Sequence, residues 1–89
     1  MLNTEQVVKN ALASTLNFSD VENIKLSNHL HKDFQLDSMS TLMFLMRLEE
    51  TIDGFYVDPE TLEMRDLETV SSIVSYIEMQ MLLSELTVH

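Results

Sequence analysis

Apolar residues recur at helical spacing over three parts of the chain, and this pattern predicts three main helices. The first covers residues 3–16, and the second covers 38–53, with Gly54 ending it. The third begins after Thr69, which is suited to be its N-cap. The apolar positions of this last helix are Val70, Ile73, Val74, Ile77 and Met81, and the pattern is extended by Leu82, Leu83 and Leu86.

Capping residues refine two of the predicted starts. Asn3 can cap the first helix, and Gln6 supplies the second half of a capping box. Asp58 followed by Pro59 is typical of a cap and a first helical position, so we expect a short helix or turn from there through Met64.

The long connection between the first two predicted helices, residues 17–36, has no clean period of 2 or 3.6. A connection of this length in a small domain is usually pinned down or functional, and we expect both. Leu30, Phe34 and Leu36 are expected to fill the bundle. No repeat or linker divides the chain, so residues 1–89 are expected to form one domain, and one Gly and one Pro favour an all-α fold.

The second predicted helix has two apolar faces. One face is assigned to the core because it holds the aromatic residue, and it consists of Thr41, Phe44, Leu45, Leu48 and Ile52. The other forms what we call the apolar strip, made of Met39, Leu42, Met43 and Met46. Three charged residues border it, Arg47, Glu49 and Glu50. An exposed strip of this kind indicates a docking surface, whereas a central helix buried on both faces is the alternative.

The net charge of the chain indicates which classes of partner it can attract. Fifteen acidic residues against five basic ones give a net charge of −10, which repels nucleic acid and anionic membranes and favours basic patches on other proteins. The acidity could also serve solubility alone. The absence of cysteine excludes disulfides, thiolate zinc sites and a protein thiol nucleophile. With no signal peptide pattern and no apolar stretch of spanning length, we expect a cytoplasmic monomer.

Ser38 stands at the start of the second predicted helix, directly after the long connection. Unpaired amide groups and the helix dipole favour a phosphate at such a position. Asp37 would repel that phosphate, so we interpret it as a contact for a modifying enzyme or for the metal ion of that enzyme. An ordinary Asp-Ser helix cap is the alternative interpretation.

Two other chemistries could be assigned to residues 29–38. His29, His31 and Asp33 suggest a metal site, but no further ligand set completes it, so we expect no metal. A triad of Ser38, His31 and Asp37 is equally unsupported, because no oxyanion hole or substrate pocket is indicated.

Most of the chain resembles an acyl carrier protein, most strongly from residue 34 to residue 77. The family's Asp-Ser-Leu signature corresponds to Asp37-Ser38-Met39, and the end of its second helix to Leu48-Glu49-Glu50. The resemblance implies a four-helix bundle with three main helices, one short helix and a long first loop. It also implies that a phosphopantetheinyl transferase attaches 4′-phosphopantetheine from coenzyme A to Ser38.

The thiol of that arm would carry acyl, aminoacyl or peptidyl groups as thioesters, which explains how a chain without cysteine could use a thiol. The implied partners are a loading enzyme for acyl or aminoacyl groups and a downstream synthase, condensing enzyme or transferase. The carrier itself would not be an enzyme. A cofactor-free acidic helical module, docking through the apolar strip, is the alternative function.

Three departures from the family pattern bear on which partners are expected. Many relatives have Gly at the position of Gln35, and fatty-acid carriers commonly have an acidic residue at the position of Met43. Arg47 adds a positive charge nearby. We therefore expect a carrier of a specialised polyketide, nonribosomal peptide or aminoacyl-transfer pathway.

Overall fold

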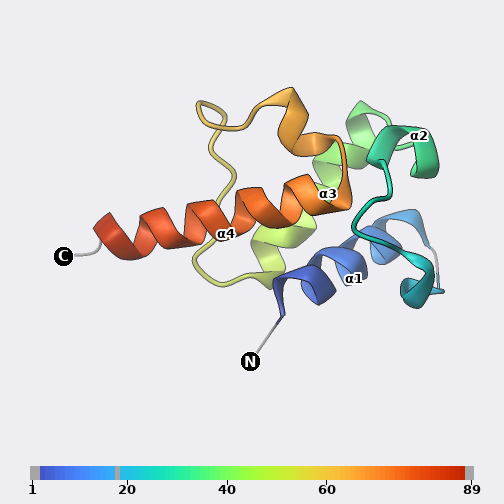
Figure 1. The fold of residues 1–89 in the computed structure, drawn as a ribbon, viewed down its shortest axis with the longest axis horizontal. Coiled ribbons are helices and arrows are strands. Elements are labelled where there is room, and N and C mark those ends of the chain that lie inside the picture. Colours follow the sequence, from blue (N-terminus) through green and yellow to red (C-terminus); the bar gives the residue numbers. More distant parts are fainter. Residues whose placement is uncertain (1–2, 18, 88–89) are drawn as a thin grey trace.

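The computed structural model describes residues 3–17 and 19–87, the last four of these through their backbone only, and it is mostly helical (Figure 1). The α-helices are α1 (Thr4–Leu16), α2 (Leu30–Phe34), α3 (Ser38–Thr51) and α4 (Val70–Thr87). Two 3₁₀ helices, η1 (Val21–Asn23) and η2 (Met64–Leu67), lie in the connections. The prediction of an all-α bundle with three main helices and one short helix is confirmed for the described residues.

The core lies where α1 packs against both α3 and α4 (Figure 1). α1 buries one apolar face against both of these helices. The connections contribute Ile24, Leu30, Leu36 and Phe55 to the same core, all less than 4% exposed. The largest fully buried side chains of α1, α3 and α4 are Val8, Leu12, Phe44, Leu48, Val70, Ile73 and Ile77.

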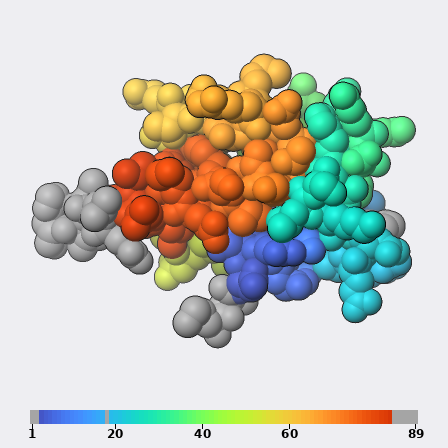
Figure 2. Space-filling model, viewed as in Figure 1, coloured from blue at the N-terminus to red at the C-terminus, as the bar shows by residue number. Residues whose placement is uncertain are grey.

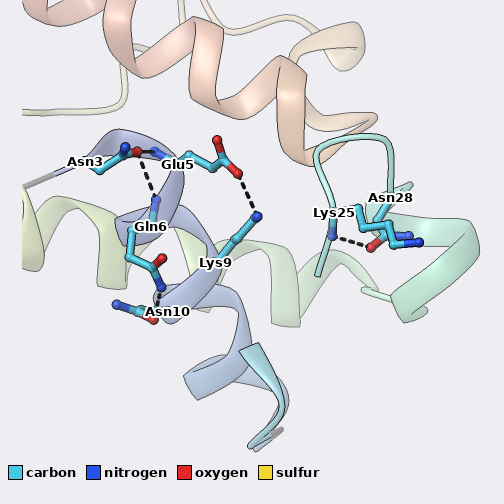
Figure 3. Close-up of polar contacts among 7 residues, drawn as sticks. All are labelled: Asn3, Glu5, Gln6, Lys9, Asn10, Lys25 and Asn28. Atoms are coloured by element: carbon cyan, nitrogen blue, oxygen red, sulfur yellow. Dashed lines mark hydrogen bonds and ion pairs between the residues drawn. The ribbon is translucent and has the colours of Figure 1, made fainter. Parts of the chain in front are cut away.

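Side-chain caps fix the start of α1 (Figure 3). Asn3 accepts hydrogen bonds from the amides of Glu5 and Gln6, at 2.9 and 3.4 Å. The predicted capping box is wrong in its second half, because the Gln6 side chain donates to Asn10 one turn along the helix, at 3.1 Å. Asn17 ends the helix as its C-cap, in the left-handed conformation with φ of 56°.

The connection between α1 and α3 is more structured than predicted, because it contains η1 and α2. Backbone hydrogen bonds tie it to the segment before α4. The amide of Leu30 donates to the carbonyl of Glu68 at 2.8 Å, and that of Val70 donates to Asn28 at 3.0 Å. As predicted, Leu30 and Leu36 are buried in the core, and Phe34 packs against it half-buried.

Two predicted boundaries are corrected. α3 ends at Thr51 rather than at residue 53, and Gly54 follows with a φ of +86° that suits glycine. The segment after Pro59 is a turn, one of the two forms expected, but the turn covers residues 59–61 and does not continue to Met64, where the 3₁₀ helix starts. The turn is fixed from outside the segment, because the amide of Asp58 donates to the hydroxyl of Tyr76 on α4, at 3.0 Å.

α4 is the longest helix and runs across the middle of the molecule, between α1 and the segment that joins α3 to η2 (Figure 2). Thr69 caps it as predicted, since its hydroxyl accepts the amide of Ser72 at 3.0 Å. The side chain of Leu86, which was predicted to extend the apolar pattern, lies outside the described residues. In the described part of the chain, no helix is both long and apolar enough to cross a membrane.

Candidate functional site

Ser38 is the first residue of α3, as its position in the sequence predicted. Its side chain is exposed, and within the described residues its hydroxyl makes no hydrogen bond. The first turn of a helix presents amide groups without intrahelical partners and a partial positive charge. The hydroxyl is therefore accessible to an enzyme and lies in a field that favours an attached phosphate.

Asp37 is the N-cap of α3. Its carboxylate accepts a hydrogen bond from the amide of Ser40 at 2.8 Å. This bond, followed by an interaction with the Ser40 side chain, holds the pKa of the Asp37 carboxyl below its usual range. The ionised cap fixes the backbone from which the Ser38 side chain projects, so the ordinary capping role is present whatever further role Asp37 has.

An open groove of about 840 Å³ lies directly beside Ser38. One wall comes from α2 and the chain that follows it, the floor comes from α3, and the opposite wall comes from η2. The lining is mainly apolar, through Leu36, Leu42, Leu45, Met64 and Leu67, with polar contributions from His29, His31, Asp37, Ser38, Thr41 and Glu68. A long flexible group attached to Ser38 fits this site, because the hydroxyl is exposed and the groove begins next to it.

The two faces of α3 are arranged as the sequence predicted. Phe44 and Leu48 are fully buried, at 0% exposure each. On the other face, Met39 is 66%, Leu42 53%, Met43 43% and Met46 51% exposed. The apolar strip is therefore on the surface, and the alternative of a helix buried on both faces is wrong. Leu42 belongs to both the strip and the groove, so the two features adjoin.

The three charged residues that border the strip differ from one another. Glu50 is exposed, whereas Glu49 is half-buried and accepts a hydrogen bond from the amide of Val57 at 2.8 Å. That bond ties the end of α3 to the following loop. Arg47 is half-buried, and its Nε atom is buried without a hydrogen-bond partner among the described residues.

The three residues that suggest a metal site, His29, His31 and Asp33, take part in local hydrogen bonds. The Nδ1 atom of His29 accepts the amide of Lys32 at 3.2 Å and so caps α2. Asp33 accepts the amide of His29 at 2.6 Å, which lowers its pKa. His31 donates from Nδ1 to the carbonyl of Leu36 at 3.1 Å. Over residues 3–17 and 19–87, no group of three potential ligands is placed to hold a metal ion.

The sequence interpretation missed the far wall of the groove, which consists of Met64, Leu67 and Glu68. These residues follow a turn and form no long periodic pattern. Their position beside Ser38 results from the antiparallel bridge between His29 and Thr69. The spacing of Met64 and Leu67 by three residues is a weak helical signal, but it does not indicate what they face.

Two comparisons with known proteins agree with this geometry. The family described as a phosphopantetheine attachment site matches residues 6–77. The solution structure of a holo acyl carrier protein from Nitrosomonas europaea superposes with a TM-score of 0.79 at 27% sequence identity, covering 90% of this chain and 98% of that one. No curated protein matches the chain.

The matched segment spans most of α1, all of α3 and the first part of α4, up to residue 77, together with the serine and the groove. The cofactor of such a protein is covalently attached 4′-phosphopantetheine, for which the exposed serine and the adjoining groove provide space. The chain belongs to the acyl carrier protein family.

Proposed function

We propose that Ser38 bears the 4′-phosphopantetheine arm and that the chain carries acyl, aminoacyl or peptidyl groups on it as thioesters. The observation that supports this most directly is the exposed Ser38 hydroxyl at the start of α3, beside an apolar groove. In the attachment step, the Ser38 oxygen forms a phosphodiester bond with the phosphopantetheinyl group of coenzyme A. The adenosine 3′,5′-bisphosphate part leaves, and the serine proton passes to a base of the transferase.

The arm supplies the thiol, and the chain's own residues position it. The Asp37 cap orders the first turn of α3, so that Ser38 is presented at a fixed point of the surface. A carboxylate has two oxygens and can accept further bonds or bind a cation while one oxygen holds the cap. Asp37 is thus suited to contact the transferase or the metal ion of the transferase as well.

The apolar strip is the proposed docking surface for partner enzymes: the transferase, a loading enzyme, and a downstream synthase, condensing enzyme or transferase. The strip adjoins the groove at Leu42, so an enzyme on the strip is close to whatever Ser38 carries. The chain presents the carried group, and the partners perform the chemistry. Because Met43 replaces an acidic residue of fatty-acid carriers, we assign the chain to a specialised polyketide, nonribosomal peptide or aminoacyl-transfer pathway.

Intact mass after co-expression with a broad-specificity phosphopantetheinyl transferase tests the attachment site. We expect the wild type to gain one phosphopantetheinyl group, Ser38→Ala to gain none, and Ser40→Ala to gain one. Ser40 is a matched control because it lies in the same helical turn as Ser38, but it is half-buried whereas Ser38 is exposed. If Ser38→Ala is still loaded, the arm is attached elsewhere.

The same experiment separates the carrier from a cofactor-free helical module that docks through the apolar strip. Such a module needs no hydroxyl at residue 38 and keeps its unmodified mass while a control carrier is loaded in the same cells. That result would refute the carrier function for this chain.

Docking through the strip is tested with Met43→Glu. Met43 is 43% exposed, so we expect little change in the free energy of unfolding, within about 0.5 kcal/mol, together with an altered rate of loading by the transferase. A large loss of stability would instead show that Met43 contributes to the core. The matched substitution Phe44→Glu, at the neighbouring buried position, is expected to unfold the domain.

A further inference from the structure

Arg47 places a positive charge beside the apolar strip, although the chain has a net charge of −10. Arg47 lies one turn after Met43 and directly follows Met46, so it borders the strip on α3. Its side chain is half-buried, and its Nε is buried without an acceptor among the described residues. The two terminal nitrogens of the guanidinium are not buried and also have no acceptor among the described residues, so a carboxylate of a partner can approach this end of the side chain.

The acidic residues nearest to Arg47 along α3 do not neutralise it. The Glu49 carboxylate accepts the amide of Val57 at 2.8 Å. Glu50 is three residues after Arg47, a spacing that permits pairing on a helix, and it is exposed. Among the described residues, the ion pairs are Lys9–Glu5 and Arg65–Glu63, and neither involves α3.

We propose that the apolar strip and Arg47 together bind a partner enzyme through an apolar surface that carries a carboxylate opposite Arg47. This inference rests on the carrier function proposed above and specifies the chemistry of the partner. Methionine and arginine are both enriched at protein interfaces, and the planar guanidinium suits a carboxylate in two-point contact. Docking on the strip would exclude water from the pair and strengthen its attraction.

The net charge of −10 attracts basic surfaces at long range but does not decide what lies opposite Arg47. A Lys or Arg of a partner at that point would face a like charge in a desolvated contact, which is costly. At short range, Arg47 therefore favours partners with an acidic group opposite it, whereas the overall charge favours basic surfaces at long range.

A charge-exchange cycle tests the proposal with a defined probe. The probe is a purified carrier-protein acyltransferase whose docking surface carries one Lys, compared with the same enzyme after that Lys is changed to Glu. Dissociation constants are measured for the holo wild type and for holo Arg47→Glu. We expect the wild type to bind the Glu form about tenfold more tightly than the Lys form, and Arg47→Glu to reverse that preference. Lys25→Glu, an exposed cation outside α3, serves as the matched control and should keep the wild-type preference.

Equal binding to the two enzymes by the wild type and Arg47→Glu, or failure of either enzyme to bind, would overturn the proposal. Intact mass of each carrier is recorded first. A chain that gains no arm refutes the carrier function, whereas a loaded chain without the charge preference refutes only the role of Arg47. Circular dichroism of Arg47→Glu checks that the loss of a half-buried side chain has not unfolded α3.

Discussion

At the scale of single residues, the turn before the site contains a backbone conformation that favours glycine. Gln35 ends α2 with φ of 57° and ψ of 36°, in the left-handed region. A side chain in this region costs roughly 1–2 kcal/mol, whereas glycine avoids that cost. This explains in physical terms why many relatives have Gly at this position. The side chain at Gln35 is therefore expected to lower the stability of the fold.

We predict that Gln35→Gly raises the free energy of unfolding by about 0.5–1 kcal/mol, because relief of the left-handed strain exceeds the added entropy of the unfolded chain. Urea denaturation measures the change. Gln6→Gly, a glutamine inside α1, is the matched control and should lower stability by about 1 kcal/mol. A loss of stability in Gln35→Gly would contradict this account.

The cap at Asp37 predicts a pH dependence. Hydrogen bonding from Ser40 lowers the pKa of Asp37 in the folded chain. A lowered pKa stabilises the fold above the unfolded value of about 3.9, and the contribution is lost as the pH falls through the lowered folded value. Asp37→Asn retains a capping oxygen but does not titrate. We expect the urea midpoint of the wild type, relative to that of Asp37→Asn, to fall between pH 6 and pH 3. The exposed Asp53→Asn should show a smaller change.

At the scale of elements, one tyrosine of α4 makes several contacts with the segment between α3 and η2. The Tyr76 hydroxyl accepts the amide of Asp58 at 3.0 Å and lies 3.2 Å from the hydroxyl of Thr61. Gln80 donates to the same hydroxyl at 3.1 Å. The Tyr76 ring is 6% exposed and meets Phe55 edge to face. One side chain of α4 thus positions a turn that Asp58 also stabilises locally, by accepting the amide of Glu60 at 3.0 Å.

Tyr76→Phe should lower the free energy of unfolding by about 1–3 kcal/mol, because the amide of Asp58 loses its partner in a half-buried setting. Tyr56→Phe is the control. Its ring is 73% exposed, so the same chemical change should alter stability by less than about 0.5 kcal/mol. Thermal unfolding of both variants gives the comparison, and equal effects would argue against a structural role for the hydroxyl.

The elements also show how far sequence reasoning extends. α1, α3 and α4 were predictable because apolar periodicity and caps such as Asn3 and Thr69 act locally. The five-residue α2 was not predicted, and the segment after Asp58 was predicted only as a short helix or turn, because contacts with distant segments help to determine both. The same holds for the site. The exposure of Ser38 and of the apolar strip could be predicted because it follows from α3 alone. The groove requires η2, which lies more than 20 residues further along the chain.

At the scale of the whole molecule, repulsion between acidic groups opposes folding. The chain has a net charge of −10, and its described residues form two ion pairs. Screening of repulsive charges by salt should therefore stabilise the domain. We predict that raising NaCl from about 0.02 M to about 0.5 M increases the unfolding temperature. A double variant of exposed acids, Glu22→Gln with Glu60→Gln, should respond less. Insensitivity to salt would contradict the importance of this repulsion.

The backbone bonds that join the two walls of the groove have a practical consequence. The amides of Leu30, Val70 and Ser71 donate across the bridge to Glu68, Asn28 and Leu26, at 2.8, 3.0 and 2.9 Å. The walls cannot separate there without breaking these bonds, and an amide that loses its bond exchanges its hydrogen with solvent. The rate of deuterium uptake at these three amides therefore reports how readily the groove opens. It can be measured on the unmodified protein before any partner or carried group is known.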